Sequence, residues 1–99
     1  MSIDIKVGKI VEAQEIAGSK NLIKLMVDIG GTVRQSIAAL RDEYEPEQLK
    51  SKLVAVVTNL KPRKIFGQKS EVMVLAALDG SAISILCPDK QVGAGSKIS

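Results

Sequence analysis

Four cationic side chains gather in one short segment of the sequence, residues 61–69. The segment reads Lys-Pro-Arg-Lys-Ile-Phe-Gly-Gln-Lys and contains no acid. Pro62 stiffens the segment and Gly67 permits a tight reversal, so the cations project from a constrained loop. Arginine binds a phosphate as a two-pronged donor, and lysine binds it as a point charge. The segment therefore predicts phosphate contacts, although a Lys/Arg-rich loop is also common as plain solvated surface.

Outside this segment the sequence holds few groups for catalysis or metal binding. It has no histidine and a single cysteine, Cys87. These counts remove the Ser-His-Asp and Cys-His arrangements, an internal disulfide and most zinc sites. The acids of residues 42–47 lack calcium-loop spacing, and residues 93–97 lack the full spacing of a phosphate loop. We therefore expect no enzyme, no catalytic residue, no metal site and no cofactor, with Cys87 as a buried thiol.

Composition and charge are those of a small globular binding domain. The 99 residues, 45% hydrophobic and 25% charged, fit one domain over residues 1–99. The net charge is +3, and four acids in residues 42–47 are separated from the cationic segment, which predicts one cationic edge. No run approaches the ~18 apolar residues of a membrane helix, and residues 1–6 show no secretory signal. We expect a cytoplasmic protein that does not insert into membranes.

Alternating apolar residues predict strands in the first half of the chain. Period-2 patterns run through residues 4–14, 23–29 and 32–40. Gly30-Gly31 marks a hairpin between the second and third of these strands. The apolar phase shifts after Gly8, which predicts a β-bulge at that residue.

The second half of the chain continues with a short helix and further strands. Pro46 suits the first position of a helix, and acids lie near its start. Apolar runs then predict strands at residues 53–60, 72–78 and 82–86, with a tight turn at Asp79-Gly80. The whole pattern indicates an all-β fold with one short helix. We expect a five-stranded Greek-key barrel of the oligonucleotide/oligosaccharide-binding (OB) type with an extra C-terminal hairpin.

Several stretches of the sequence resemble the tRNA-binding domain family. They are Val7-Gly8-Lys9-Ile10-Val11, Val27-Asp28-Ile29-Gly30, Tyr44-Glu45-Pro46-Glu47-Gln48-Leu49, Asn59-Leu60-Lys61-Pro62-Arg63-Lys64, Ser70-Glu71-Val72-Met73 and Pro88-Asp89, and they span nearly the whole chain. Members of the family include a domain appended to or standing beside methionyl-tRNA synthetase, free dimeric tRNA-binding proteins and CsaA-type export chaperones. The resemblance implies an OB barrel, usually a homodimer, that recognises tRNA by its shape.

The resemblance also implies which side chains contact the partner. Positions used by the RNA-binding members correspond here to Asn59, Lys61, Arg63, Lys64, Ser70 and Met73. The cationic segment adds Lys69, and Phe66 adds an apolar contact. Cations and hydroxyls track phosphate and ribose, while a methionine can lie against bases. From their positions alone, Met73 could equally belong to the core and Ser70 could cap a turn.

Two stretches near these residues depart from the RNA-binding pattern. Ala38-Ala39 stands where those members tend to have Ser-Gly, and Val72 replaces a glycine before the methionine. Side chains at these positions leave less room for a nucleic-acid backbone than glycines do. Both stretches resemble the CsaA chaperones, in which this face resembles a peptide-binding surface. By that resemblance the exposed apolar residues here would be Ile65, Phe66, Val72 and Met73.

Two functions therefore stay open at this point. One is a non-catalytic, structure-specific tRNA-binding protein that serves as an accessory to methionyl-tRNA synthetase. The other is a chaperone that binds unfolded preproteins for export. A homodimer is expected from the resemblance, and the apolar C-terminal hairpin with Ile83, Ile85 and Leu86 supports it because that surface needs covering.

Overall fold

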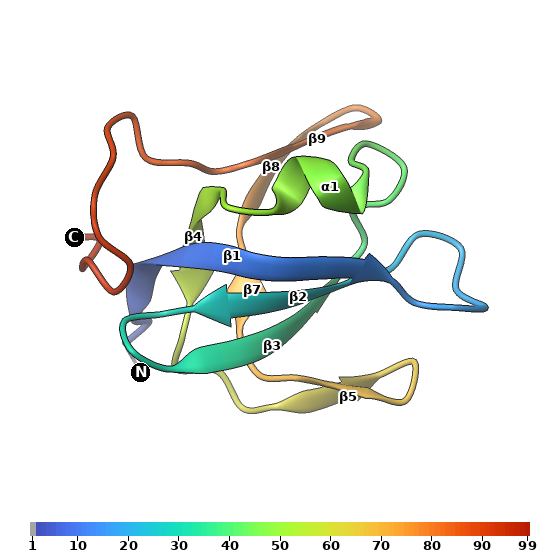
Figure 1. Cartoon of the computed structure of the whole chain (residues 1–99), viewed down its shortest axis with the longest axis horizontal. Coiled ribbons are helices and arrows are strands. Elements are labelled where there is room, and N and C mark those ends of the chain that lie inside the picture. Colours follow the sequence, from blue (N-terminus) through green and yellow to red (C-terminus); the bar gives the residue numbers. More distant parts are fainter. Residues whose placement is uncertain (1) are drawn as a thin grey trace.

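A nearly closed antiparallel β-barrel makes up most of the structure, a computed structural model that describes residues 2–99 (Figure 1). Its five-stranded sheet has the order β3-β2-β1-β4-β7, and β5–β6 and β8–β9 are separate hairpins. The elements are β1 (Ile5–Glu15), β2 (Ile23–Asp28), β3 (Val33–Ala38), α1 (Pro46–Leu49), β4 (Leu53–Val57), β5 (Arg63–Ile65), β6 (Gln68–Ser70), β7 (Met73–Val74), β8 (Ala76–Asp79) and β9 (Ala82–Ile85). The predicted all-β barrel is therefore confirmed, with a second extra hairpin, β5–β6, in the cationic segment.

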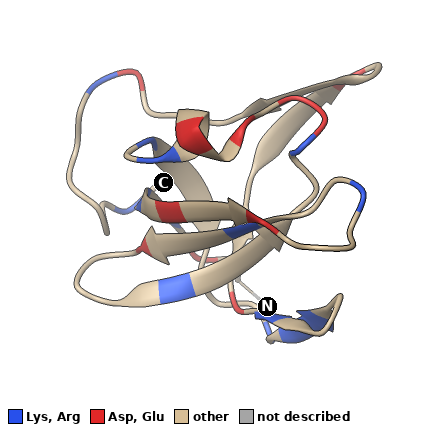
Figure 2. Ribbon diagram, turned by 45° about the vertical axis from the view of Figure 1, so that its right-hand side comes forward, with Lys and Arg blue, Asp and Glu red and all other residues tan. Residues whose placement is uncertain are grey.

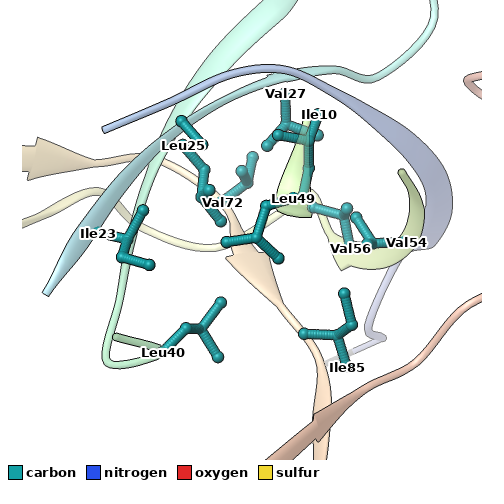
Figure 3. Close-up of a cluster of buried hydrophobic side chains, with 11 residues drawn as sticks. Ile10, Ile23, Leu25, Val27, Leu40, Leu49, Val54, Val56, Val72 and Ile85 are labelled. Atoms are coloured by element: carbon teal, nitrogen blue, oxygen red, sulfur yellow. The ribbon is translucent and has the colours of Figure 1, made fainter. Parts of the chain in front are cut away.

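Alternation along the strands sends one row of apolar side chains into the barrel. In β2, Ile23, Leu25 and Val27 are fully buried, and the residues between them are only partly covered. Leu49 of α1 and Ile85 of β9 join the same aliphatic cluster (Figure 3). This core holds the barrel wall on which the two hairpins are mounted.

Gly8 makes room for the core and does not form a bulge. Pairing between β1 and β4 continues without interruption through Gly8, whereas the register between β1 and β2 shifts between Ile10 and Glu12. A Cβ on Gly8 would lie 2.5 Å from a methyl of Val27 and 2.9 Å from a methyl of Val56. The bulge predicted at Gly8 is therefore wrong. The phase changes because Gly8 and Ile10 face the core, whereas Val7 is buried on the opposite face of β1, and the bulge lies further along the strand.

Hydrogen bonds join β3 to the end of β6 and to the residues between β6 and β7. These bonds partly close the gap between β3 and β7, the two edge strands of the sheet. The N–H of Glu71 donates to the carbonyl of Gln35 at 2.8 Å, and the N–H of Gln35 donates to the Glu71 carboxylate at 3.2 Å. The N–H of Ile37 donates to the hydroxyl oxygen of Ser70 at 3.1 Å. These bonds fix the base of the β5–β6 hairpin against β3.

The acidic stretch at residues 42–47 forms the start of α1 and its ion pairs. At the start of the helix the N–H of Glu45 donates to the Gln48 side-chain oxygen at 2.7 Å, and the N–H of Gln48 donates to the Glu45 carbonyl at 3.0 Å. Arg41 contacts Glu15 of β1 at 2.9 Å and Glu45 at 3.0 Å. The hydrogen bond that Arg41 donates to the Glu15 carboxylate is the main cause that raises the pKa of the Arg41 guanidinium. The acids thus attach the helix to the barrel.

The C-terminal part of the chain wraps around the barrel in short segments. The strand predicted at residues 72–78 is divided at Leu75, so that β7 pairs with β4 and β8 pairs with β9. Residues 95–98 lie along the start of β1, where the N–H of Gly95 donates to the carbonyl of Val7 at 2.7 Å. The glycine-containing stretch at residues 93–97 is therefore part of the barrel's outer edge.

Cys87 is exposed, and its predicted burial is wrong. The strand β9 ends at Ile85, so Cys87 lies beyond the segment whose side chains enter the core. Within residues 2–99, no helix has the length and apolar character needed to cross a membrane.

Candidate nucleic-acid interface

The β5–β6 hairpin places two lysines side by side on its exposed face. In its register Arg63 pairs with Ser70, Lys64 with Lys69, and Ile65 with Gln68. Residues directly opposite each other in an antiparallel pair share one face, so Lys64 and Lys69 point the same way. Like charges in that position repel each other and destabilise the hairpin. Among the ion pairs of residues 2–99, none involves either lysine.

The turn of this hairpin is strained at an aromatic residue. Phe66 and Gly67 have φ angles of 52° and 78°, and they form the two-residue loop between Ile65 and Gln68. Positive φ at both loop residues is the pattern of a type I′ turn, for which Asn-Gly is preferred. A phenylalanine in the left-handed region is sterically unfavourable. Its ring is nevertheless 56% exposed, so packing in the core does not explain it.

A groove of about 490 Å³ lies beside the hairpin, between β3 and the β7–β8 segment. Its lining is mostly aliphatic and includes Leu60, Met73 and Leu78. Lys61 and Arg63 are the cations of the lining, and its acid, Glu71, accepts the N–H of Gln35. The groove therefore combines an apolar floor with positive charge, which suits an anionic or amphipathic partner.

Cationic side chains are concentrated on the β5–β6 hairpin, and others lie on a barrel strand and on several loops (Figure 2). Figure 2 shows Lys and Arg on the β5–β6 hairpin, while Asp and Glu colour α1 and parts of β1. Several of those acids are held in ion pairs with Arg41 and Lys50. The cationic edge predicted from residues 61–69 is therefore confirmed as a projecting hairpin.

Two predicted site residues have their polar groups engaged within the fold. The Oδ1 atom of Asn59 accepts the N–H of Asp4 at 2.9 Å, and its Nδ2 donates to the carbonyl of Ser2 at 2.8 Å. The Ser70 hydroxyl accepts the N–H of Ile37. Ser70 therefore attaches the base of the hairpin to β3, and Asn59 attaches the segment before the hairpin to residues 2–4.

The structure separates the two apolar residues at the start of β7. Met73 is 44% exposed and lines the groove. Val72 is 3% exposed and belongs to the core cluster, so its predicted exposure is wrong. Neighbouring residues of a strand point to opposite sides, and Val72 takes the inward side. Ala38 and Ala39 both line the groove, so their methyl groups narrow it where other members tend to have Ser-Gly.

Phe66 lies apart from the groove that Lys61, Arg63 and Met73 share. It lines a second hollow of about 330 Å³ near the tip of the hairpin. Gln14 of β1, Lys24 of β2 and Gln68 of β6 line the same hollow. These three residues were not among the predicted contacts, because they are distant in sequence and no motif links them.

The fold and the cationic hairpin agree with a family of known proteins. Residues 5–97 match the family described as "Putative tRNA binding domain". The chain belongs to this tRNA-binding domain family, and its OB-type barrel is the family's fold as the sequence predicted.

Relatives of two kinds share this domain. The chain is 48% identical over 97 residues to a methionine–tRNA ligase of Methanocaldococcus jannaschii, covering 97% of this chain but 15% of that protein. A MetRS related protein from Pyrococcus horikoshii has a similar structure, with a TM-score of 0.91 at 32% identity over 98% of this chain and 90% of that chain. A CsaA chaperone protein from Picrophilus torridus has a TM-score of 0.90 at 32% identity over 99% of this chain and 92% of that chain.

Proposed function

We propose that this domain binds tRNA without catalysing a reaction, and that the β5–β6 hairpin supplies phosphate contacts. The observation that carries the proposal is the facing pair of Lys64 and Lys69. A phosphate lying across both ammonium groups relieves their repulsion, so binding stabilises an element that is electrostatically unfavourable alone. Lys61 and Arg63 continue the positive surface into the groove. Membership of the tRNA-binding domain family supports tRNA as the anion.

Removing the facing lysines together tests this proposal. In Lys64→Ala/Lys69→Ala, tRNA affinity at low salt falls, and the slope of log K against log salt becomes shallower by about 1–2. The control Lys52→Ala/Lys90→Ala removes the same charge from the hollow around Cys87 and leaves the slope close to that of the unmodified chain. Filter binding of total tRNA across a salt series provides the measurement. Equal slopes in all three proteins contradict the proposal.

A second candidate function, binding of unfolded preproteins, is favoured by the apolar lining of the groove. Leu60 and Met73 offer a surface to extended apolar segments, and the flexible Met73 adapts to varied partners. The similarity to CsaA chaperones supports this reading. A competition assay at two salt concentrations separates the two candidates. If an unfolded precursor displaces labelled tRNA equally well at both salt concentrations, and Met73→Ser weakens this displacement, the chaperone function is favoured. Retention of tRNA favours the first function.

We also propose a homodimer. Leu78 and Leu86 are 75% and 43% exposed near the C-terminal hairpin, and burying them against a second copy removes apolar surface from water. Ile85, which the sequence placed on this surface, is instead buried in the core. Sedimentation tests the proposal: Leu78→Asp/Leu86→Asp shifts a dimer to a monomer. Sedimentation of the unmodified chain as a monomer excludes it.

Three further statements stay predictions. They are association with a methionyl-tRNA synthetase, residence in the cytoplasm and a single domain over residues 1–99. The identity to methionine–tRNA ligases supports the first. Co-purification of the tagged chain with a synthetase from its own cells tests it. A single cooperative unfolding transition of the chain supports one domain, and two transitions contradict it.

A further inference from the structure

Phe66 is an aromatic side chain that does not pack in the core. The sequence has two aromatic residues, Tyr44 and Phe66. The Tyr44 hydroxyl oxygen accepts the N–H of Ile85 at 3.1 Å, and the residue packs against the core cluster. Phe66 instead lies at the tip of the hairpin, more than half exposed, on a backbone with φ of 52°. An aromatic residue held in a strained and exposed position has a cost that folding alone does not explain.

The hollow beside Phe66 has the groups that a nucleobase needs. The ring reaches toward the loop after β1, where a Cβ on Gly18 would lie 3.7 Å from the Cζ of Phe66. Gln14 and Gln68 line the hollow with side-chain amides that both donate and accept hydrogen bonds, and Lys24 adds a cation. Glu15 also lines it, but Arg41 pairs with this carboxylate at 2.9 Å and offsets its charge. Its volume of about 330 Å³ lies at the lower end of small-ligand clefts, about 300–1,000 Å³.

We propose that Phe66, with Gln14, Lys24 and Gln68 around it, forms a subsite for one unpaired base of a bound RNA. The base stacks on the phenyl ring, the amides contact its polar edge, and Lys24 contacts the adjoining phosphate. The subsite is separate from the groove that contains Lys61 and Arg63. Because strand residues rise about 3.3 Å each, Phe66 lies about 10 Å along the hairpin from Arg63. A paired RNA segment on the cations can therefore extend its single-stranded end to the ring. This inference rests on the proposed tRNA-binding function.

Substitutions at Phe66 separate base stacking from a structural role. Phe66→Asn places the preferred type I′ residue in the turn, so the melting temperature rises while the ring is lost. Phe66→Leu retains an apolar side chain with the same backbone strain but removes the aromatic face. If the ring instead stabilises the hairpin by packing over Gly18, Phe66→Asn lowers the melting temperature, and that result overturns the proposal.

Binding of two matched RNA probes provides the second measurement. One probe is a blunt duplex RNA, and the other is the same duplex with a single-stranded 3′ overhang. The unmodified chain binds the overhang probe more tightly by on the order of tenfold, and Phe66→Asn and Phe66→Leu both abolish this preference. Phe66→Tyr retains it. The control Val92→Asn removes another exposed apolar side chain, on the C-terminal loop, and leaves the preference unchanged.

The possible failures are distinguishable. If the unmodified chain binds neither RNA, the proposed function itself fails. If it binds both with the same affinity, or if the preference survives in Phe66→Leu, the base subsite fails while tRNA binding stands. If Phe66→Leu weakens binding of an unfolded apolar peptide but leaves both RNA affinities unchanged, the hollow takes a peptide side chain and the proposal is overturned.

Discussion

Gly8 and Gly93 are glycines in opposite surroundings. A Cβ on Gly8 would enter the space of Val27 and Val56, whereas a Cβ on Gly93 would meet no atom within 4 Å. The two valines are β-branched and stiff, and both are fully buried, so they have little freedom to move aside. The same residue type therefore serves close packing at one position and carries no packing constraint at the other.

This contrast gives a prediction at the scale of single residues. Gly8→Ala overpacks the core and lowers the free energy of unfolding by about 1–3 kcal/mol. Gly93→Ala changes it by less than about 1 kcal/mol, because the new methyl group extends into open space. Urea unfolding of the two variants beside the unmodified chain measures both values. A Gly8→Ala variant as stable as Gly93→Ala would show that the strands move apart at little cost.

At the scale of elements, the position of the β5–β6 hairpin depends on its attachment to β3. The bond from the Ile37 N–H to Ser70, together with the Gln35–Glu71 pair, connects segments at least 33 residues apart. A second bond from the Gln35 side-chain amide to the carbonyl of Lys69 at 2.8 Å holds the same strand. These bonds hold the cations of the hairpin in a fixed position beside the groove.

Ser70→Ala should therefore act through stability before it acts on binding. The variant leaves the N–H of Ile37 without its acceptor in a partly buried position and lowers the free energy of unfolding by about 1–3 kcal/mol. Hydrogen exchange at Ile37 reports the loss directly, as faster exchange than in the unmodified chain. Unchanged exchange with weaker tRNA binding would instead make the Ser70 hydroxyl a direct contact.

At the scale of the whole molecule, the charge pattern is made by lysine, arginine, aspartate and glutamate side chains, whose ordinary pKa values lie far from neutral pH. The chain has no histidine. Lysines and an arginine form the cationic hairpin, whereas acids gather around α1 (Figure 2). The attraction for an anionic partner therefore needs no proton uptake.

We accordingly predict that tRNA affinity at constant salt changes by less than about threefold between pH 6 and 8. Binding titrations at a fixed ionic strength measure it. A pH-dependent step in that window would point to a group outside the cations named here. An exposed lysine-to-histidine replacement, Lys64→His, is the matched comparison, because it introduces a pH-dependent charge into the hairpin and weakens binding as pH rises.

Stability at high pH depends on a different group, Lys50. Attraction from Glu12, with a smaller contribution from Glu47, raises its pKa above the ordinary value of 10.5. A raised pKa of a base stabilises the fold below the ordinary value, and this stabilisation is lost as pH rises through the raised pKa. Lys50→Gln should therefore be less stable than the unmodified chain at neutral pH, with the difference closing above pH 10.5. Urea unfolding of both proteins at neutral pH and above pH 10.5 measures this small effect. A difference in the free energy of unfolding that is the same at the two pH values contradicts the prediction.

The sequence by itself determined the barrel class, the cationic segment and the family. Strand periodicity is a property of short stretches, and β2 follows it without exception, with every second residue buried. Charge clustering and the Asn59–Met73 motif are likewise contiguous in the chain, so no three-dimensional information is needed to find them. Errors arose where a local pattern had two structural causes, as at Gly8, whose phase change indicated a bulge but reflects buried apolar residues on both faces of β1, Val7 on one and Ile10 on the other.

Only the tertiary structure decided which side chains share a surface. The pairing of Lys64 with Lys69 depends on hairpin register, and the engagement of Ser70 depends on a strand more than thirty residues away. The hollow beside Phe66 brings together residues of three strands that no sequence spacing relates. Register and long-range contacts arise from packing the whole chain at once. The candidate contact residues could therefore be named from the sequence, but their division between a groove and a separate hollow could not.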